Sequence, residues 1–261
     1  MNAAANPQGT LVLVPNTLDL GTECEVDLRE VLPQAVIDRA ATLGFWVAEN
    51  AKTTRALLKR VGQLVPLAQP LQQIQIHELP RPPKGGHASK GSPPADLKPL
   101  LAPALAGHDV GLLSEAGLPA VADPGAALVQ AAHGLGIPVQ VLAGPSSLLL
   151  ALAASGLNGQ SFAFVGYLPV EAAARSARIR ELEATSRRLD QTQIAIETPY
   201  RNDALLGALV QHLQPGTHLA VASGLTLPHA RCEMRAVQAW RAKAGQALGD
   251  RLPTVFCWLA R

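Results

Sequence analysis

The segment that decides the fold is Leu112-Leu113-Ser114-Glu115-Ala116-Gly117-Leu118-Pro119-Ala120-Val121-Ala122-Asp123-Pro124-Gly125. The apolar run 110–113 at its start predicts a buried strand, and residues 126–133 after it predict a helix. The loop between them holds two carboxylates, two prolines and two glycines. Open α/β folds bind ligands in such loops, at the carboxyl ends of their strands. The segment therefore predicts an α/β fold with a ligand site in this loop.

A second strand, loop and helix follow further along the chain. Residues 139–142 predict a strand, residues 148–155 predict a helix, and Ala143-Gly144-Pro145-Ser146-Ser147 lies between them. Proline and serine are favoured at the start of a helix, where exposed N–H groups attract a carboxylate or a phosphate. We therefore expect a second group of ligand-binding residues here.

The rest of the chain alternates short apolar runs with longer helical patterns, which indicates an α/β fold. Strands are expected at residues 11–14, 45–48, 74–78, 110–113, 139–142, 162–167, 193–197, 218–222, 232–236 and 255–259. Helices are expected at residues 34–42, 53–61, 97–106, 126–134, 148–155, 172–188 and 202–212. Because five of these strands lie on each side of Gly144-Pro145, we predict two sheets of similar size.

These motifs resemble the tetrapyrrole methylase superfamily, which uses S-adenosylmethionine (SAM). The nearest branch is the ribosomal RNA small-subunit methyltransferase I type, which 2′-O-methylates a cytidine. The resemblance covers nearly the whole chain from about residue 11, because four motifs occur in the order of that branch. They are Ser114-Glu115-Ala116-Gly117-Leu118-Pro119 with Asp123-Pro124-Gly125, Leu142-Ala143-Gly144-Pro145-Ser146-Ser147, Gly166-Tyr167-Leu168-Pro169, and Ile196-Glu197-Thr198-Pro199-Tyr200-Arg201.

Two motifs near the N-terminus depart from the pattern of that branch. The branch has Pro-x-x-x-Gly-Asn-Leu after its first strand, whereas this chain has Pro15-Asn16-Thr17-Leu18-Asp19-Leu20-Gly21. The branch has Ala-Glu-Asp-Thr-Arg after its second strand, whereas here Asn50 stands in place of the Asp. Both changes fall on the expected substrate side, so the resemblance supports SAM more directly than it supports an RNA acceptor. A sister group with a different methyl acceptor stays an alternative.

The resemblance implies a two-lobed α/β fold with two mixed sheets of about five strands each, flanked by helices, and SAM held between the lobes. We expect an N-terminal lobe at 1–143, with the substrate side and part of the SAM site, and a C-terminal lobe at 144–261, with the rest of the SAM site and the dimer contacts. The implied cofactor-binding residues are Glu115, Ala116, Gly117, Leu118, Pro119, Ala120, Asp123, Ser146, Ser147, Glu197, Thr198, Pro199, Leu225 and Thr226.

Methyl transfer from SAM is an in-line displacement, in which positioning the acceptor supplies most of the acceleration. A ribose hydroxyl acceptor also benefits from a general base, for which Glu49 is the candidate. The candidate substrate-binding residues are Asn50, Lys52, Arg55, Lys84 and Lys90. The alternatives are that Lys52 and Arg55 are ordinary exposed helix residues, that Asp123 fixes its turn, and that Glu115 is a cap.

Two basic stretches admit two interpretations each. Residues 80–94, which contain Lys84 and Lys90, form either a surface loop or a mobile basic lid whose lysines meet phosphate. The stretch 175–188 is rich in arginine, but Glu171, Glu181, Glu183 and Asp190 lie in it or beside it. Mixed charges on a helix favour a solvent-exposed face over an RNA site.

Composition is that of a globular enzyme. The 261 residues are 48% hydrophobic but only 3% aromatic, so aliphatic side chains must build the core. A formal net charge of +2 argues against a strongly basic nucleic-acid binder, although a local patch would suffice. The three scattered cysteines predict reduced thiols, and the seven scattered histidines predict no metal site. We expect a cytoplasmic protein with no signal peptide and no membrane partner.

The function expected from these observations is SAM-dependent methylation of small-subunit ribosomal RNA at a ribose 2′-hydroxyl. One alternative is methylation of a tetrapyrrole or another small molecule. The other is a non-catalytic SAM-binding or RNA-binding protein, suggested by the two altered motifs. The expected partners are ribosomal RNA or the small ribosomal subunit, and a second copy of the chain in a homodimer.

Overall fold

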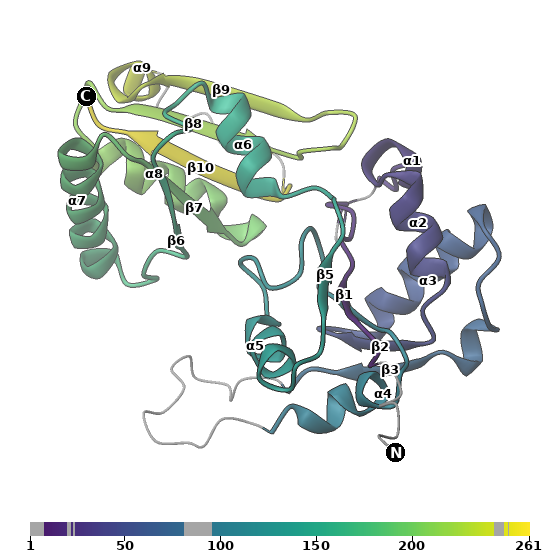
Figure 1. The fold of residues 1–261 in the computed structure, drawn as a ribbon. Coiled ribbons are helices and arrows are strands. Elements are labelled where there is room, and N and C mark those ends of the chain that lie inside the picture. Colours follow the sequence, from purple (N-terminus) through teal and green to yellow (C-terminus); the bar gives the residue numbers. More distant parts are fainter. Residues whose placement is uncertain (1–7, 20–21, 23, 81–95, 243–247, 250) are drawn as a thin grey trace. The chain divides into compact units, whose positions relative to one another are not determined.

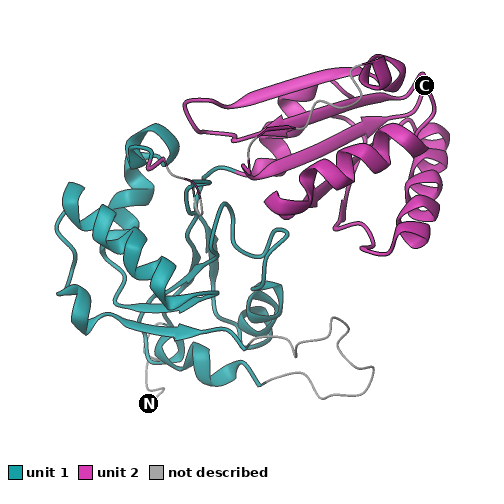
Figure 2. Ribbon diagram, turned by 180° about the vertical axis from the view of Figure 1, so that it is seen from behind, with its two compact units in different colours: residues 1–20, 26–145 teal, residues 21–25, 146–261 magenta. Residues whose placement is uncertain are grey.

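Two separate cores, each built on a five-stranded sheet, make up the fold (Figure 1). The computed structural model describes residues 8–19, 22, 24–80, 96–242, 248–249 and 251–261. Unit 1 comprises residues 1–20 and 26–145, and unit 2 comprises residues 21–25 and 146–261 (Figure 2). The predicted α/β class with two five-stranded sheets is confirmed.

The sheet of unit 1 is parallel throughout. Its order is β3-β2-β4-β1-β5, and every pairing is parallel. The strands are β1 (Leu11–Leu13), β2 (Phe45–Ala48), β3 (Gln75–Glu78), β4 (Val110–Leu113) and β5 (Val139–Val141). The expectation of a mixed sheet is wrong here, because helical crossovers return the chain to the same end before each new strand. All residues of β1 and β4 are buried, as their apolar sequences require.

Helices cover both faces of this sheet. Alternate residues of β1 join different apolar clusters: Val12 packs with residues of the helices α1, α2 and α3, and Leu11 packs with residues of η2, α4 and α5. The helices are α1 (Leu28–Val31), α2 (Gln34–Ala41), α3 (Ala51–Leu64), η1 (Leu71–Gln73), η2 (Lys98–Leu101), α4 (Ala102–Leu105) and α5 (Ala126–Gly134).

The sheet of unit 2 is mixed. Its order is β6-β7-β10-β8-β9, in which β6 and β7 are parallel and the other pairs are antiparallel. The strands are β6 (Phe162–Gly166), β7 (Thr192–Glu197), β8 (His218–Ser223), β9 (Arg231–Ala236) and β10 (Thr254–Leu259). The helices are α6 (Ser147–Ser155), α7 (Ala172–Leu189), η3 (Pro199–Arg201), α8 (Asn202–His212) and α9 (Val237–Ala242).

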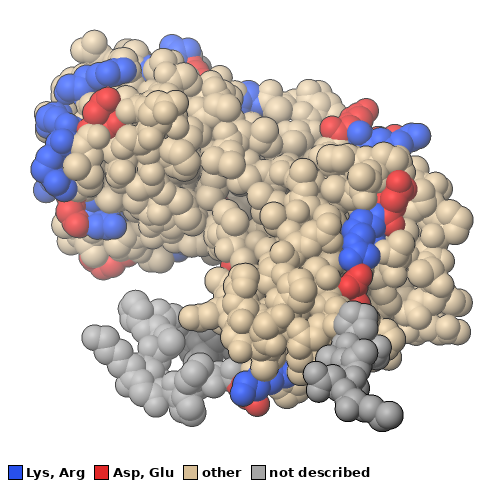
Figure 3. Space-filling view, in the orientation of Figure 1, with Lys and Arg blue, Asp and Glu red and all other residues tan. Residues whose placement is uncertain are grey.

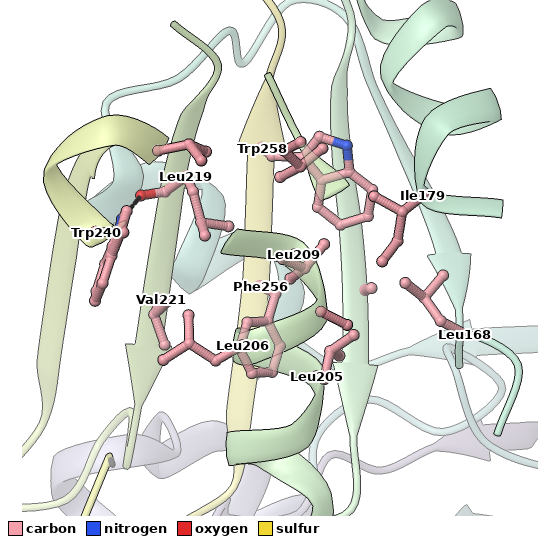
Figure 4. Packing of buried hydrophobic residues seen from close by; sticks show 14 of the residues in the cluster. Leu168, Ile179, Leu205, Leu206, Leu209, Leu219, Val221, Trp240, Phe256 and Trp258 are labelled. Carbon is pink, nitrogen blue, oxygen red and sulfur yellow. Dashed lines mark hydrogen bonds between the residues drawn. The ribbon is translucent and has the colours of Figure 1, made fainter. Parts of the chain in front are cut away.

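Alternate side chains of β10 divide the core of unit 2 into two layers. Phe256 and Trp258 pack among residues of α7, α8 and α9 (Figure 4), whereas Val255 and Cys257 pack with α6 on the other face. The indole of Trp240 donates a hydrogen bond of 2.9 Å to the Leu219 carbonyl, which satisfies its buried N–H.

Short helices are the elements that the sequence did not predict. α1, η1 and α9 contain four, three and six residues, too few for a helical hydrophobic period to stand out. α3 begins at Ala51, earlier than expected, because the Asn50 side chain caps it by accepting from the Lys52 N–H at 2.9 Å. Among the described residues, none of the helices has the length and apolar character needed to span a bilayer.

Replacing Phe256 tests the layered core of unit 2. Phe256 is fully buried, so Phe256→Ala is expected to lower the free energy of unfolding by about 3–5 kcal/mol. Phe162→Ala, at a strand position that is 42% exposed, is the control and should cost less than about 1 kcal/mol. Urea unfolding followed by tryptophan fluorescence measures both. Equal losses in the two variants would contradict this description of the core.

Candidate functional site

Three loops of unit 1 meet at the carboxyl edge of its parallel sheet. β4 lies between β1 and β2, so the segments that follow these strands leave the sheet side by side. They are residues 14–19 after β1, Glu49 and Asn50 after β2, and residues 114–125 after β4. This is the edge at which parallel α/β sheets bind ligands.

Asn16 joins the first and third of these loops. Its side-chain amide donates to the carbonyls of Ser114 at 3.2 Å and Glu115 at 2.9 Å. Its backbone N–H donates to the Gly117 carbonyl at 2.9 Å, and the Gly117 N–H donates to Thr17 at 3.3 Å. Asn16 is only 4% exposed, so these hydrogen bonds, called the Asn16 latch below, are shielded from water. Nothing in the sequence indicates this role beyond the position of an Asn just after a strand.

The remaining polar residues of the altered first motif are also held by the protein. The Asp19 carboxylate accepts from the Thr17 hydroxyl and pairs with Arg60 at 3.1 Å. The Asp19 pair ties α3 to the loop after β1, and Arg60 also donates to the Val26 carbonyl at 2.6 Å, just before α1. The departure from the pattern of the branch therefore produces a buried network that fixes this loop.

The loop after β4 contains an unusual concentration of left-handed backbone. Four of its residues have positive φ, with values of 67°, 65°, 65° and 132° at Gly117, Ala120, Ala122 and Gly125. For alanine this conformation costs about 1 kcal/mol. Such strain persists only where the surroundings impose it, and it concentrates at ligand-binding sites. A Cβ at Gly117 would lie 3.3 Å from the Leu18 side chain and 3.4 Å from the Pro145 carbonyl.

Glu49, Asn50 and Glu115, which the sequence predicted at the site, are brought together. The Glu49 Oε2 accepts the Glu115 backbone N–H at 3.0 Å, and the Asn50 Nδ2 donates to the Glu115 Oε1 at 2.8 Å. An Asp at position 50, as in the related branch, would oppose two carboxylates. In this chain Asn50 replaces that repulsion by a hydrogen bond to Glu115. The Asn at position 50 therefore suits the glutamate that it faces.

Asp123 and Glu49 have raised pKa values. Burial, followed by the charges of Glu49 and Glu115, raises the pKa of Asp123 to about 7. Burial also raises the pKa of Glu49, and the Glu115 charge adds to the effect. The site therefore holds a proton that exchanges near neutral pH, which is the property required of a general base.

The predicted substrate-binding lysines and arginine are not part of this cluster. Lys52 and Arg55 are exposed on α3. Lys84 and Lys90 lie outside the described residues. The predicted cofactor residues Ala116, Leu118 and Pro119 lie in the strained loop between Glu115 and Ala120.

In unit 2, two predicted cofactor segments share one apolar cluster. Ser146 precedes α6 with an extended backbone, and its hydroxyl makes no capping hydrogen bond, while Ser147 is the first residue of the helix. Thr226 has a φ of 70°, and its hydroxyl is buried without a partner among the described residues. Leu148 of α6 and Leu225 beside Thr226 belong to the same cluster on one face of the sheet.

Glu197 has a structural role in holding the third predicted segment. Its buried carboxylate accepts from the Thr198 N–H at 2.8 Å and from the Arg201 guanidinium at 2.6 Å. In the sheet Glu197 pairs with Thr254, which pairs with Ser223 on its other side. Thr198 and Pro199 therefore lie at the same edge of the sheet as the loop that contains Leu225 and Thr226.

The sequence matches the model of a known protein family over most of its length. Residues 35–238 match the family described as "Tetrapyrrole (Corrin/Porphyrin) Methylases". The chain belongs to the tetrapyrrole methylase family. Among solved structures, uroporphyrin-III-C-methyltransferase from Thermus thermophilus aligns with a TM-score of 0.49 and 17% identity, covering 96% of this chain and 92% of that chain.

Similar proteins in this family carry the name Ribosomal RNA small subunit methyltransferase I. The protein of this name from Mesorhizobium japonicum is 41% identical over 127 residues, which are 49% of this chain and 42% of the relative. The Xylella fastidiosa protein is 32% identical over 176 residues, 67% of this chain and 57% of the relative. The Mycobacterium tuberculosis protein is 37% identical over 147 residues, 55% and 50% respectively. The chain spans about half the length of these relatives.

Returning Asn50 to the Asp of the branch tests its pairing with Glu115. Asn50→Asp is expected to lower the free energy of unfolding at pH 8 by about 1–2 kcal/mol, because two carboxylates then face each other. The double variant Asn50→Asp/Glu115→Gln restores a donor and should recover most of this loss. Urea unfolding of the parent, Asn50→Asp, Glu115→Gln and the double variant gives the coupling energy between positions 50 and 115. Additive effects of the two substitutions would contradict the pairing.

The raised pKa of Asp123 predicts a pH-dependent stability. The folded protein holds this proton up to about pH 7, whereas the unfolded chain releases it near 3.8, the ordinary pKa of an aspartate side chain. The carboxyl therefore stabilises the fold at low pH, and this contribution is lost as pH rises toward 7. Asp123→Asn should remove the loss, so that its stability relative to the parent rises by about 1–2 kcal/mol from pH 5 to pH 8.

Thermal unfolding between pH 5 and pH 8 makes this measurement. Asp38→Asn, at an exposed position of α2, is the matched control for removing a surface carboxylate. A relative stability of Asp123→Asn that stays constant with pH, or that changes as the control does, would contradict the assignment.

Proposed function

We propose that this chain is a SAM-dependent methyltransferase that methylates a ribose 2′-hydroxyl in small-subunit ribosomal RNA. The observation that carries the proposal is the strained loop after β4, latched by Asn16 beside the carboxylates of Glu49 and Asp123. Family membership and relatives named ribosomal RNA small subunit methyltransferase I support this activity and this substrate.

The residues at both predicted SAM segments fit the polar parts of that molecule. Ser114, at the start of the strained loop, and Thr226 each bury a hydroxyl oxygen that has no partner among the described residues. Such atoms are costly unless a ligand or water completes their hydrogen bonds. In unit 2, the uncapped N–H groups at the start of α6 and the serines Ser146 and Ser147 suit a carboxylate. We infer that these groups, with the backbone of residues 115–120, hold SAM.

The chain's own residues then position the acceptor and remove its proton. SAM supplies a methyl group already activated by its sulfonium. Glu49 accepts the proton of the ribose hydroxyl at Oε1, because Oε2 is already engaged by the Glu115 N–H. Burial makes Glu49 a stronger base than an exposed carboxylate. Asp123, with a pKa of about 7, is the second candidate for this role.

A small-molecule acceptor is the second candidate function. It is favoured by the altered motifs at Asp19 and Asn50, since both lie at the loops where we expect the acceptor. A homodimer in the cytoplasm completes the proposal, and light scattering of the full chain tests the dimer.

The activity is tested by transfer of labelled methyl groups from SAM to small ribosomal subunits from cells that lack this modification. Glu49→Gln is expected to lower kcat by about 10²- to 10⁴-fold, because it removes the base while keeping the hydrogen bond to Glu115. Its Kd for SAM should stay within about twofold of the parent, as measured by calorimetry.

Glu30→Gln, at an exposed position of α1, is the control and should retain full turnover. Unchanged turnover in Glu49→Gln would exclude Glu49 as the base, and Asp123→Asn in the same assay then tests the second candidate. A parent protein that methylates a tetrapyrrole but no ribosomal subunit would favour the small-molecule function.

A further inference from the structure

Both tyrosines of this chain lie on its surface. The chain has only two Tyr, four Phe and three Trp residues. Trp46, Trp240 and Trp258 are buried, whereas Tyr167 is 56% exposed and Tyr200 is 72% exposed. Phe162 and Phe164 of β6 are also exposed, at 42% and 37%. The exposed aromatic side chains therefore gather on β6 and on the segments that follow β6 and β7.

The sheet topology brings the two tyrosines together. β6 and β7 are parallel neighbours, and Gly166 pairs with Ala195 near their carboxyl ends. Tyr167 directly follows β6, and Tyr200 lies in η3, just after β7. Tyr167 and Tyr200 therefore follow adjacent strands at the same end of the sheet. The Arg201 guanidinium lies 5.8 Å from the centre of the Tyr200 ring.

Arg201 gives Tyr200 a rigid base. Its guanidinium is fixed by two hydrogen bonds to the buried Glu197 carboxylate, at 2.6 and 3.1 Å. A cation held against an aromatic ring restricts the motion of the ring. The conformational entropy of the ring is then lost on folding rather than on binding. Tyr200 therefore presents a preorganised apolar face to solvent.

The helix that follows Tyr167 in the chain, α7, exposes more arginines than acidic residues between its first and last residues. Arg180, Arg187 and Arg188 are exposed along α7, and the other exposed residues between Ala172 and Arg188 are alanines and Glu181. Glu181 is paired within the helix to Arg178 at 2.8 Å. Glu183 is buried, where it accepts from the Gln214 N–H at 2.7 Å. In Figure 3 blue atoms, with red atoms among them, lie at the edge where Figure 1 places α7.

The expectation of mixed charges on this helix is confirmed, because Glu181 is exposed on α7 and Glu171 and Asp190 are exposed at its two ends. Within Ala172–Leu189 itself, three arginines but only one acidic residue are exposed. The exposed arginines Arg180, Arg187 and Arg188 lie in its second half, over about 12 Å of helix, and Arg187 donates to the Arg261 carbonyl at 3.4 Å, just past the end of β10. An RNA strand that contacts both the tyrosines and these arginines must therefore run along α7, which is about 27 Å long. Aromatic faces stack bases irrespective of sequence, and arginines neutralise phosphates.

We propose that Tyr167 and Tyr200 stack unpaired bases of the RNA substrate, and that the arginines of α7 contact its phosphates. This inference rests on the proposed function, because it assigns the surface that binds the RNA acceptor. It requires single-stranded RNA, since bases within a duplex do not offer their faces to side chains.

Fluorescence anisotropy with a labelled single-stranded oligouridylate of about 12 nucleotides tests this surface. Tyr167→Ala/Tyr200→Ala should weaken RNA binding at least about tenfold, whereas Tyr167→Phe/Tyr200→Phe should bind within about twofold of the parent. Arg180→Gln/Arg187→Gln should lower the slope of log K against log salt by about 1.4, as expected for two lost phosphate contacts. Phe162→Ala, an exposed aromatic at the opposite end of β6, is the control and should bind RNA normally.

The outcomes separate this inference from the proposed function. RNA binding by Tyr167→Ala/Tyr200→Ala equal to the parent, in a protein that methylates ribosomal subunits, would overturn the inference alone. An equal loss in Phe162→Ala, or a loss of SAM affinity without a loss of RNA affinity, would also overturn it. A parent protein that neither binds RNA nor methylates subunits would overturn the proposed function and the inference together.

Discussion

The buried amide of Asn16 fixes the geometry on which the candidate site of unit 1 depends. It holds the loop after β1 against the loop after β4 by donating to the backbone carbonyls of Ser114 and Glu115. The loop after β4 carries four residues with positive φ, so it would relax to other conformations without such a restraint. Arg60 and Asp19 extend the restraint to α3. The local strain and the latch together indicate a loop preorganised for a ligand.

Electrostatics in the same region follow from that restraint. The latched loop brings the Glu115 backbone and side chain against Glu49 and Asn50. Asp123 lies near enough to both glutamates for their charges to add to its burial and raise its pKa. A site that assembles acidic groups in a half-buried position creates a base that titrates near neutral pH. The amide of Asn50 limits this repulsion at Glu115, so the altered motif is consistent with a working site.

Periodicity and turn chemistry predicted the strands and the long helices closely, because each apolar run is bounded by Gly, Pro or a capping residue. The positions of Glu49, Asn50 and Glu115 after parallel strands could also be predicted as neighbours. Asn16 could not, since its role depends on which loop lies opposite. The excess of exposed arginines within α7 could not either, because the sequence does not show that Glu183 points into the core while Arg180 and Arg187 face water. Parallel pairing throughout unit 1 likewise depends on crossovers rather than on strand composition.

Calorimetric titration of the purified chain with SAM tests the central claim, that the strained loop is a SAM site. We predict saturable binding of one SAM per chain, and of its demethylated product. Gly117→Val should weaken this binding by at least tenfold, because φ at this position is 67° and the added Cβ would crowd Leu18 and the Pro145 carbonyl. Gly134→Val, where an added Cβ meets open space, is the matched control. Absence of binding by the folded parent, or equal binding by both variants, would contradict the account.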